Sequence, residues 1–274
     1  MAGTLYIVGT PIGNLSDLSP RALEILSTCD FIAAEDTRVT RKLLTRFDFK
    51  NELVPYHEHN RKQAGEQISQ RLLAGESCAL VTDAGMPAIS DPGEDLVNLC
   101  HENGIPVASV PGPSAVVTAL ALSGLHTSRF TFEGFLSVSK KSRREHLTSL
   151  LNETRTMVFY EAPHKLPATL RDMYETFGDR RIALVKEITK IHETVERTTL
   201  KEAAEKYSQV SPKGEYVLII DAKPQADNEE QESEDPIALA KSLLEKGMSA
   251  SEAAKQAAKL TGMKKGDIYK ALLH

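Results

Sequence analysis

Residues 81–93 read Val-Thr-Asp-Ala-Gly-Met-Pro-Ala-Ile-Ser-Asp-Pro-Gly, a loop rich in glycine and proline that follows the short apolar run Cys78–Val81. The same order recurs through the first 120 residues, where short apolar runs, loops and helical patterns alternate. This alternation is typical of an α/β domain built on a mostly parallel sheet. Ligands bind outside the carboxyl ends of such strands. The loops are therefore predicted to line a ligand-binding cleft.

Three more loops follow predicted strands in this region. They read Gly9-Thr-Pro-Ile-Gly-Asn14, Glu35-Asp-Thr-Arg38 and Pro111-Gly-Pro-Ser-Ala115, after strands predicted at Leu5–Val8, Phe31–Ala34 and Val107–Val110. Glycine lets a ligand approach the backbone closely, and proline removes a competing N–H donor. One such loop is more often an ordinary strand-to-helix turn. Four at the same edge of one sheet favour a binding site.

The remainder of the chain divides into three further segments. A second α/β domain is expected from about residue 124, and alternation in its last three strands indicates some antiparallel pairing. Acidic residues without large apolar neighbours then predict a flexible linker. Three short helical patterns with seven lysines against three acidic residues follow, as a helix-turn-helix-like tail. The predicted domains are 1–123, 124–222, the linker 223–235 and the tail 236–274.

Composition and motifs exclude several classes of protein. The hydrophobic fraction of 41% and charged fraction of 26% are those of an ordinary globular chain. Three cysteines without CxxC spacing predict buried thiols in a cytoplasmic protein. No apolar stretch reaches the ~18 residues of a membrane span, and the first residues read as a strand rather than a signal peptide. The chain has no G-x-G-x-x-G, P-loop or H-E-x-x-H motif, which argues against common dinucleotide, nucleotide and zinc-protease sites.

The four loops, taken together and in order, resemble those of the tetrapyrrole (corrin/porphyrin) methylase family. The resemblance implies two α/β domains with a cleft between them that holds S-adenosylmethionine, and a homodimer. Further segments resemble a branch that methylates the ribose 2′-hydroxyl of a cytidine in the decoding region of 16S rRNA, within the small ribosomal subunit. Besides the tail, these segments are Tyr56-His-Glu-His-Asn60, Gly134-Phe-Leu136, Tyr160-Glu-Ala-Pro-His164 and Lys186-Glu-Ile-Thr-Lys190.

The resemblance also implies where the cofactor binds. Contacts are expected from the first, third and fourth loops and from the second domain. The expected residues are Pro11, Asp83, Gly85, Met86, Ser114, Ala115, Tyr160, Glu161 and Pro163. Asp83 could pair with a cofactor amine, or it could simply cap the turn that follows it.

Basic residues near the cleft are candidates for binding RNA phosphates. Arg38 could grip a phosphate, aided by Arg41 and Lys42, or it could form an ion pair that shapes its own loop. A run of four cations in five residues is the strongest phosphate-binding candidate in the two α/β domains, although such a run is usually a solvated helix start. These residues are Lys140, Lys141, Arg143 and Arg144.

Transfer of a methyl group to a ribose hydroxyl needs a base or strict positioning, because that hydroxyl is a poor nucleophile near neutral pH. Glu187, Lys190 and Glu193 are candidate bases, and the sequence does not choose among them. Lys190 would need a pKa lowered by burial. His57 and His59 would share one face of an extended segment, but without further ligands they indicate a surface or RNA contact rather than a metal site.

Two other functions remain open from the sequence. The fold would also suit a methyltransferase acting on a small tetrapyrrole precursor, although such a substrate would not require the basic run or the basic tail. A non-catalytic RNA-binding module that merely holds the cofactor is the third reading.

Overall fold

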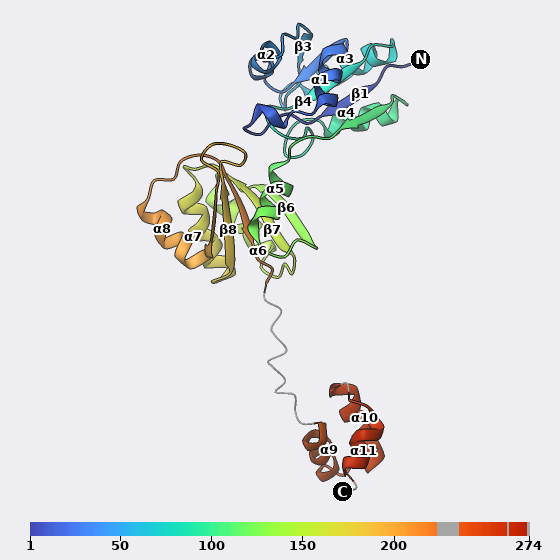
Figure 1. Cartoon of the computed structure of the whole chain (residues 1–274), viewed down its shortest axis with the longest axis vertical. Helices are drawn as coiled ribbons and strands as arrows, with labels where there is room; N and C mark the ends of the chain where they lie inside the picture. The colour runs from blue at the N-terminus through green and yellow to red at the C-terminus, as the bar shows by residue number, and fades with distance from the viewer. Residues whose placement is uncertain (224–235, 262, 273–274) are drawn as a thin grey trace. The chain divides into compact units, whose positions relative to one another are not determined.

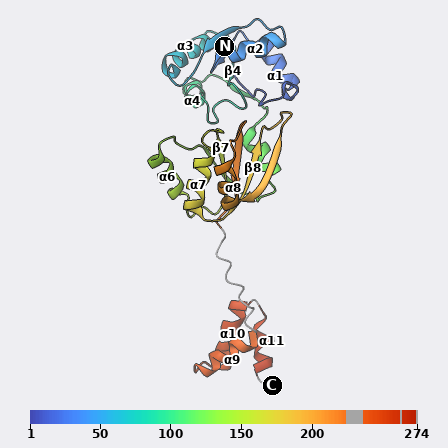
Figure 2. The same ribbon diagram turned by 90° about the vertical axis from the view of Figure 1, so that its left-hand side faces the viewer.

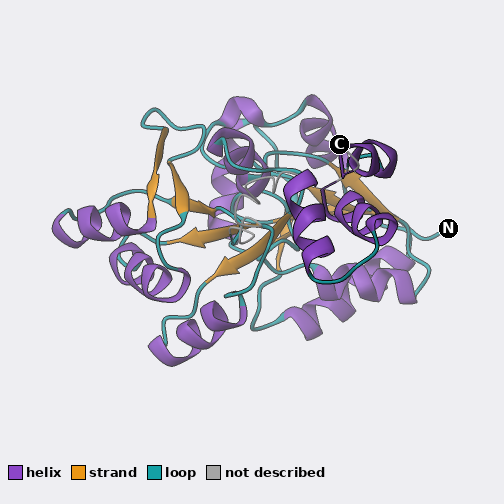
Figure 3. Cartoon of the chain, turned by 90° about the horizontal axis from the view of Figure 1, so that it is seen from below, coloured by secondary structure: helices purple, strands orange, loops and turns teal. Residues whose placement is uncertain are grey.

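The computed structural model describes residues 1–223, 236–261 and 263–272. The chain forms two compact units, Met1–Lys223 and Pro224–His274. The first unit contains two five-stranded sheets, each flanked by helices, and these two α/β layers are here called the first and second lobes (Figures 1 and 3). Apart from Lys223, the predicted acidic linker lies outside the described residues.

The first sheet is entirely parallel, as the alternating sequence pattern predicts. Its strand order is β3-β2-β4-β1-β5, and each neighbouring pair is parallel. Because all strands run the same way, the loops that follow them meet at one edge of the sheet. The strands are β1 (Leu5–Val8), β2 (Phe31–Ala34), β3 (Glu52–Pro55), β4 (Cys78–Val81) and β5 (Val107–Val110).

Helices cover both faces of this sheet. On one face α1 (Pro20–Thr28) and α2 (Thr37–Arg46) bury Leu26 and Leu44 against the strands. On the other face α3 (Arg61–Leu73) and α4 (Glu94–Glu102) bury apolar side chains, with Tyr56 packed beneath them. A single 3₁₀ turn, Leu15–Asp17, precedes α1. Burial on both faces explains why β2 and β4 are fully buried along their whole length.

The second sheet is mixed, with strand order β6-β7-β10-β8-β9. Its last three strands in sequence pair antiparallel, which confirms the prediction from their alternation, and β6 pairs parallel with β7. On one face lie α6 (Lys140–Ser149), α7 (Leu166–Phe177) and α8 (Leu200–Gln209). The strands are β6 (Phe130–Phe135), β7 (Thr156–Glu161), β8 (Arg181–Lys186), β9 (Thr194–Thr199) and β10 (Tyr216–Ile220).

Helix α5 (Ala115–Ser123) covers the other face of the second sheet. The predicted boundary at residue 124 would have assigned α5 to the first domain. Instead, Val116, Ala119 and Leu120 are buried against strands β7, β8 and β10. The helix starts directly after the fourth loop, so it carries the chain from the ligand-binding edge of the first lobe into the core of the second.

The tail is a bundle of three short helices, side by side in Figures 1 and 2. They are α9 (Pro236–Glu245), α10 (Ala250–Thr261) and α11 (Lys265–Leu272). Ala240, Ala254, Ala257 and Ile268 form its core. Ser249 and Glu252 make the reciprocal capping box at the start of α10 that the S-x-x-E spacing indicates.

Two further features of the described residues concern the cysteine thiols and the lengths of the helices. The three cysteines are free and buried, as the spacing predicts. Among the described helices, none combines the length and apolar character needed to cross a bilayer.

Candidate active site

The loops at the carboxyl edge of the first sheet are locked to one another by backbone contacts. Thr10, after β1, exchanges two backbone hydrogen bonds with Gly85, after β4, at 2.9 and 3.1 Å. A Cβ added to Gly9 would lie 2.7 Å from Cα of Gly112, after β5. No larger residue than glycine fits this contact without moving the backbone. The first, third and fourth loops therefore form one rigid floor.

A cavity of about 530 Å³ opens on this floor and is closed by the second lobe. Its size lies within the range of small-molecule sites. It combines apolar walls with several carboxylates. The lining residues are Ile12, Glu35, Thr82, Asp83, Ala84, Ser90, Asp91, Ala115, Phe135, Tyr160, Glu161, Ala162, Pro163, Ile188, Glu215, Tyr216 and Val217.

Most of the predicted cofactor residues lie at or beside this cavity. Asp83, Ala115, Tyr160, Glu161 and Pro163 line it directly. The other four lie on the same loops, one or two residues from a lining residue; these are Pro11, Gly85, Met86 and Ser114. The structure thus brings together residues from three loops of the first lobe and one segment of the second.

Three carboxylates converge at the sheet edge, and two of them were not identified from the sequence. The sequence indicates a cofactor contact for Asp83, whereas Glu35 and Asp91 lie within the same loop motifs without an assigned role. Thr82 donates a hydrogen bond from Oγ1 to Glu35 at 2.6 Å. Burial, together with the negative charges of Glu35 and Asp83, raises the pKa of Asp91 to about 6. Burial and Glu35 also raise the pKa of Asp83.

Tyr160 and Glu161 shape the wall that the second lobe contributes. The ring of Tyr160 lies between Phe132 and Phe135, with centroids 4.9 and 5.3 Å away. Burial raises the pKa of its hydroxyl to about 12, so it is a neutral donor at physiological pH. The buried Glu161 carboxylate accepts hydrogen bonds from Thr169 and from the N–H of Ala162, and pairs with Lys165 at 3.0 Å. Glu161 therefore holds the wall in shape through its own partners.

The predicted catalytic segment after β8 forms a tight turn against the first lobe. A Cβ added to Gly13 would lie 2.6 Å from Cγ of Lys190, so the two lobes touch here. Glu187 and Thr189 adopt left-handed backbone angles (φ +54° and +64°), which cost energy for residues other than glycine. Of this segment, Ile188 lines the cavity. The turn thus directs the apolar side chain of Ile188 to the cavity, while the charged groups of Glu187 and Lys190 pair with each other.

The structure argues against Lys190 as a base. Its ammonium pairs with Glu187 at 3.0 Å and with Glu215 at 2.8 Å. Partial burial lowers its pKa, but these two partners outweigh burial and raise the pKa above its usual value. A base would need the opposite shift. Hydrogen bonding by the N–H of Glu215 lowers the pKa of Glu187, while Glu193 accepts a hydrogen bond from the N–H of Thr189 at 2.6 Å.

Arg38 makes the internal ion pair that was one of its two sequence interpretations, and its exposure leaves the other open. It pairs with Asp36 at 2.6 Å and so shapes its own loop, and the interaction lowers the pKa of Asp36 to about 2. Its side chain is nevertheless 87% exposed. Arg38, Arg41 and Lys42 together line a shallow groove along the start of α2. This exposed basic groove remains available to a phosphate.

The basic run at the start of α6 is only partly available. Arg143 was predicted to bind phosphate, but its side chain is buried and pairs with Asp172 at 2.7 Å, so this prediction is wrong. Arg144 pairs with Asp172 and Glu175 and is about half exposed. Lys140 and Lys141 are exposed. The helical period turns Arg143 inward toward α7 and leaves the two lysines at the surface.

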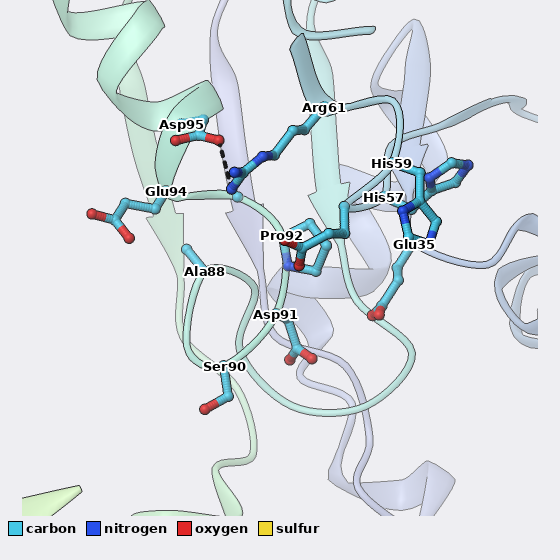
Figure 4. A pocket seen from close by; sticks show the side chains of 12 residues that line it. Glu35, His57, His59, Arg61, Ala88, Ser90, Asp91, Pro92, Glu94 and Asp95 are labelled. Carbon is cyan, nitrogen blue, oxygen red and sulfur yellow. Dashed lines mark ion pairs between the residues drawn. The ribbon is translucent and has the colours of Figure 1, made fainter. Parts of the chain in front are cut away.

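His57 and His59 face each other with ring centroids 6.0 Å apart. Within the described ranges, no group of three or more potential ligands is arranged to hold a metal ion. Both side chains line a second pocket beside the cavity (Figure 4).

Comparison with known proteins agrees with this architecture. Residues 4–204 match the model of the tetrapyrrole (corrin/porphyrin) methylases, and residues 230–274 match that of the RsmI C-terminal HTH domain. The chain therefore belongs to the tetrapyrrole (corrin/porphyrin) methylase family, which confirms the resemblance carried by the four loops.

The curated relatives are more specific than the family. Ribosomal RNA small subunit methyltransferase I of Synechocystis sp. is 44% identical over 272 residues, covering 99% of this chain and 98% of the relative. The protein of the same name from Thermotoga maritima is 46% identical over 221 residues, covering 81% of this chain but 99% of the relative. That relative has no counterpart for about a fifth of this chain.

Among solved structures, uroporphyrin-III C-methyltransferase from Thermus thermophilus, complexed with S-adenyl homocysteine, aligns with a TM-score of 0.57. The alignment covers 80% of this chain and 97% of that one at 18% sequence identity. This likeness shows the fold of the two lobes.

Proposed function

We propose that this protein transfers a methyl group from S-adenosylmethionine to the ribose 2′-hydroxyl of a cytidine in the decoding region of 16S rRNA. The observation that carries the proposal is the cavity between the lobes, together with relatives of nearly full length that are named as small-subunit rRNA methyltransferases. The protein would act in the cytoplasm on the small ribosomal subunit.

The chemistry of the cavity fits the methyl donor. S-adenosylmethionine combines a flat base, a ribose and a sulfonium cation. Ile12, Phe135 and Ile188 provide apolar surface, and the carboxylates of Glu35, Asp83 and Asp91 complement a positive charge. Backbone groups of the glycine-rich loops can hydrogen-bond the base. We assign donor binding to Pro11, Asp83, Gly85, Met86, Ser114, Ala115, Tyr160, Glu161 and Pro163.

The turn after β8 supports the donor site without supplying a base. Lys190 links Glu187 of this turn to Glu215, and Glu215 lines the cavity. The contact between Gly13 and Lys190 fixes the first loop against the second lobe. We therefore propose that Glu187, Lys190 and Glu193 position the cavity wall, in place of the catalytic role expected from the sequence.

RNA binding is assigned to exposed cations outside the cavity. Arg38, Lys140 and Lys141 keep accessible charges, and Arg144 keeps part of its surface. Such contacts with phosphates position a nucleic acid without reading its sequence. The lysine-rich tail would add further contacts of this kind.

A homodimer is supported by the character of α5. The helix contains no charged residue and is apolar on every side, a pattern typical of a helix buried all round. One side packs on the second sheet, yet Val117 is 59% and Leu122 is 40% exposed. We propose that a second copy covers this face.

One assay tests the proposed reaction. The protein is incubated with S-adenosylmethionine labelled in the methyl group and with small ribosomal subunits that lack the modification. Label in 16S rRNA is the expected result. Label in a tetrapyrrole precursor supplied in its place would contradict the proposal and support the small-molecule alternative. Donor binding without transfer to either substrate would favour the non-catalytic RNA-binding module.

A further inference from the structure

Two apolar side chains are exposed at the mouth of the donor cavity, between β6 and α6. Phe135, the last residue of β6, lines the cavity and yet is 57% exposed, and Val138 is 80% exposed. Apolar residues that stand singly on a surface need no explanation. These two lie three residues apart beside a binding cavity, on the segment 134–144, which is here called the rim segment.

A β-bulge aims the ring of Phe135. The pairing of β6 with β7 shifts between Phe132 and Gly134, and Gly134 has a left-handed backbone angle (φ +63°). Bulges beside binding sites commonly re-aim a side chain in this way. The ring is supported by Tyr160, with centroids 5.3 Å apart, and by the ammonium of Lys165, which lies 5.7 Å from its centroid. More than half of Phe135 nevertheless remains accessible.

Two cationic side chains hold the backbone of the rim segment in place. Arg143, which is buried, donates hydrogen bonds from Nη1 to the carbonyl oxygens of Ser137 and Val138, both at 3.2 Å. The ammonium of Lys165 donates to the carbonyl oxygen of Leu136 at 3.2 Å. Three successive carbonyl groups are therefore fixed. A surface that is rigid before binding loses less conformational entropy when a ligand binds.

The charge of the rim segment complements a polyanion. Residues 134–144 contain four cationic side chains and no acidic residue. Lys140 and Lys141, at the start of α6, are exposed, and the contact of Lys141 with Glu145 at 3.9 Å is a solvent-exposed pair of little strength. Proteins that bind single-stranded RNA combine aromatic rings, on which bases stack, with basic side chains that contact phosphates. The rim segment has both features side by side.

We propose that the base of the target nucleotide stacks on Phe135 at the mouth of the cavity. A neighbouring base packs on Val138, and the phosphates of the strand lie at Lys140 and Lys141. The inference rests on the proposed function, since it takes single-stranded rRNA as the acceptor. Stacking at the mouth directs the attached ribose into the cavity, where the methyl donor binds. Phe135 thereby positions the 2′-hydroxyl, in addition to the apolar surface that it offers the donor.

The test uses the full chain and small ribosomal subunits that lack the modification. Phe135→Leu keeps an apolar side chain at the cavity and removes the aromatic face. It should lower kcat/KM for the subunits about fivefold or more, the loss expected when one base no longer stacks. Its affinity for S-adenosylmethionine, measured by calorimetry, should stay that of the wild type. Phe135→Tyr keeps the ring and should restore kcat/KM.

Phe130→Leu is the matched control for this substitution. Phe130 is the first residue of the same strand, is 39% exposed and does not line the cavity. At about 3.3 Å per residue it lies roughly 15 Å from Phe135 along β6. The control should keep both kcat/KM and donor affinity. A loss of donor affinity in Phe135→Leu as large as its loss of kcat/KM would show a role in the donor site alone and would contradict the inference.

A photoreactive analogue identifies what lies against the ring. Benzoylphenylalanine in place of Phe135, irradiated in the complex with small subunits, should become attached to a nucleotide of 16S rRNA. If it is attached to a ribosomal protein instead, or if Phe135→Leu keeps the wild-type kcat/KM, the inference is wrong although the proposed function stands. If the wild type methylates no subunit RNA, the proposed function fails and the inference fails with it.

The phosphate contacts are tested by salt dependence. Lys140→Gln combined with Lys141→Gln should weaken subunit binding and reduce the slope of log affinity against log salt concentration by about 1.4, since each phosphate contact to a single strand contributes about 0.7. A slope equal to that of the wild type would contradict these contacts.

Discussion

At the scale of single residues, the site gathers carboxylates whose ionised forms destabilise the folded protein. Asp91 lies beside Glu35 and Asp83 at the end of two parallel strands, and its pKa is raised from 3.8 to about 6. Such a shift means that the ionised carboxylate destabilises the folded state. Functional sites commonly lower the stability of a protein in this way, and interactions elsewhere in the fold compensate for the loss.

Asp91→Asn should therefore stabilise the protein while it weakens binding of the methyl donor, whose positive charge this carboxylate complements. Between about pH 4 and pH 6 the folded state keeps a proton that the unfolded chain has lost, so the wild type loses stability as pH rises through this window. Above pH 6, the variant should be more stable by about 1 kcal/mol, less than 1.36 kcal/mol per pKa unit because the group is partly solvated. Urea denaturation at pH 4 and pH 7.5 measures this. A variant less stable than wild type at pH 7.5 would contradict the account.

At the scale of elements, the strands and helices were largely predictable because hydrophobic periodicity and turn residues are local signals. The predicted strands Leu5–Val8 and Phe31–Ala34 match β1 and β2 along their whole length. What the sequence did not reveal depends on contacts between distant segments. Asp172, on α7, draws Arg143 inward, and Glu215, on the loop before β10, neutralises Lys190. The convergence of Glu35 and Asp91 likewise appears only once β2 and β4 lie side by side.

The contact between the first and fourth loops gives a prediction at this scale. Gly9→Ala places a Cβ 2.7 Å from the Cα of Gly112, and backbone atoms cannot yield as a side chain can. The fourth loop must shift, and affinity for S-adenosylmethionine should fall at least tenfold in calorimetry. Gly65→Ala, within α3, is the matched control, because the added Cβ would lie 3.7 Å from Cδ2 of Leu99 on α4, an ordinary van der Waals distance. It should keep donor affinity and gain up to about 1 kcal/mol of stability from helix propensity. Equal affinities in the two variants would refute the rigid floor.

At the scale of the whole molecule, the tail is expected to serve substrate binding rather than chemistry. It forms its own compact unit with its own small core, and the Thermotoga relative has about the length of the two lobes alone. Deletion of residues 224–274 should leave S-adenosylmethionine affinity unchanged, weaken binding to small subunits and reduce the salt dependence of that binding. Filter binding at several salt concentrations measures the change. Equal loss of donor and subunit binding would contradict this division of labour.

The proposed dimer gives a second prediction for the whole molecule. Val117→Asp places a charge on the exposed apolar face of α5 and should convert a dimer to a monomer of 30.1 kDa in light scattering. Val210→Asp alters a similarly exposed valine after α8 and should leave the mass unchanged. A wild-type protein that is already monomeric, or a Val117→Asp variant that remains dimeric, would show that α5 is not the interface.

The central claim is that the cavity between the two lobes delivers a methyl group to a ribose hydroxyl of 16S rRNA. The most direct measurement is mass spectrometry of nucleosides after the labelled reaction with small subunits, followed by nuclease mapping of the labelled fragment. The account predicts that the label is in 2′-O-methylcytidine from the decoding region. Label on a base, in another nucleoside or in a different region of the RNA would contradict it.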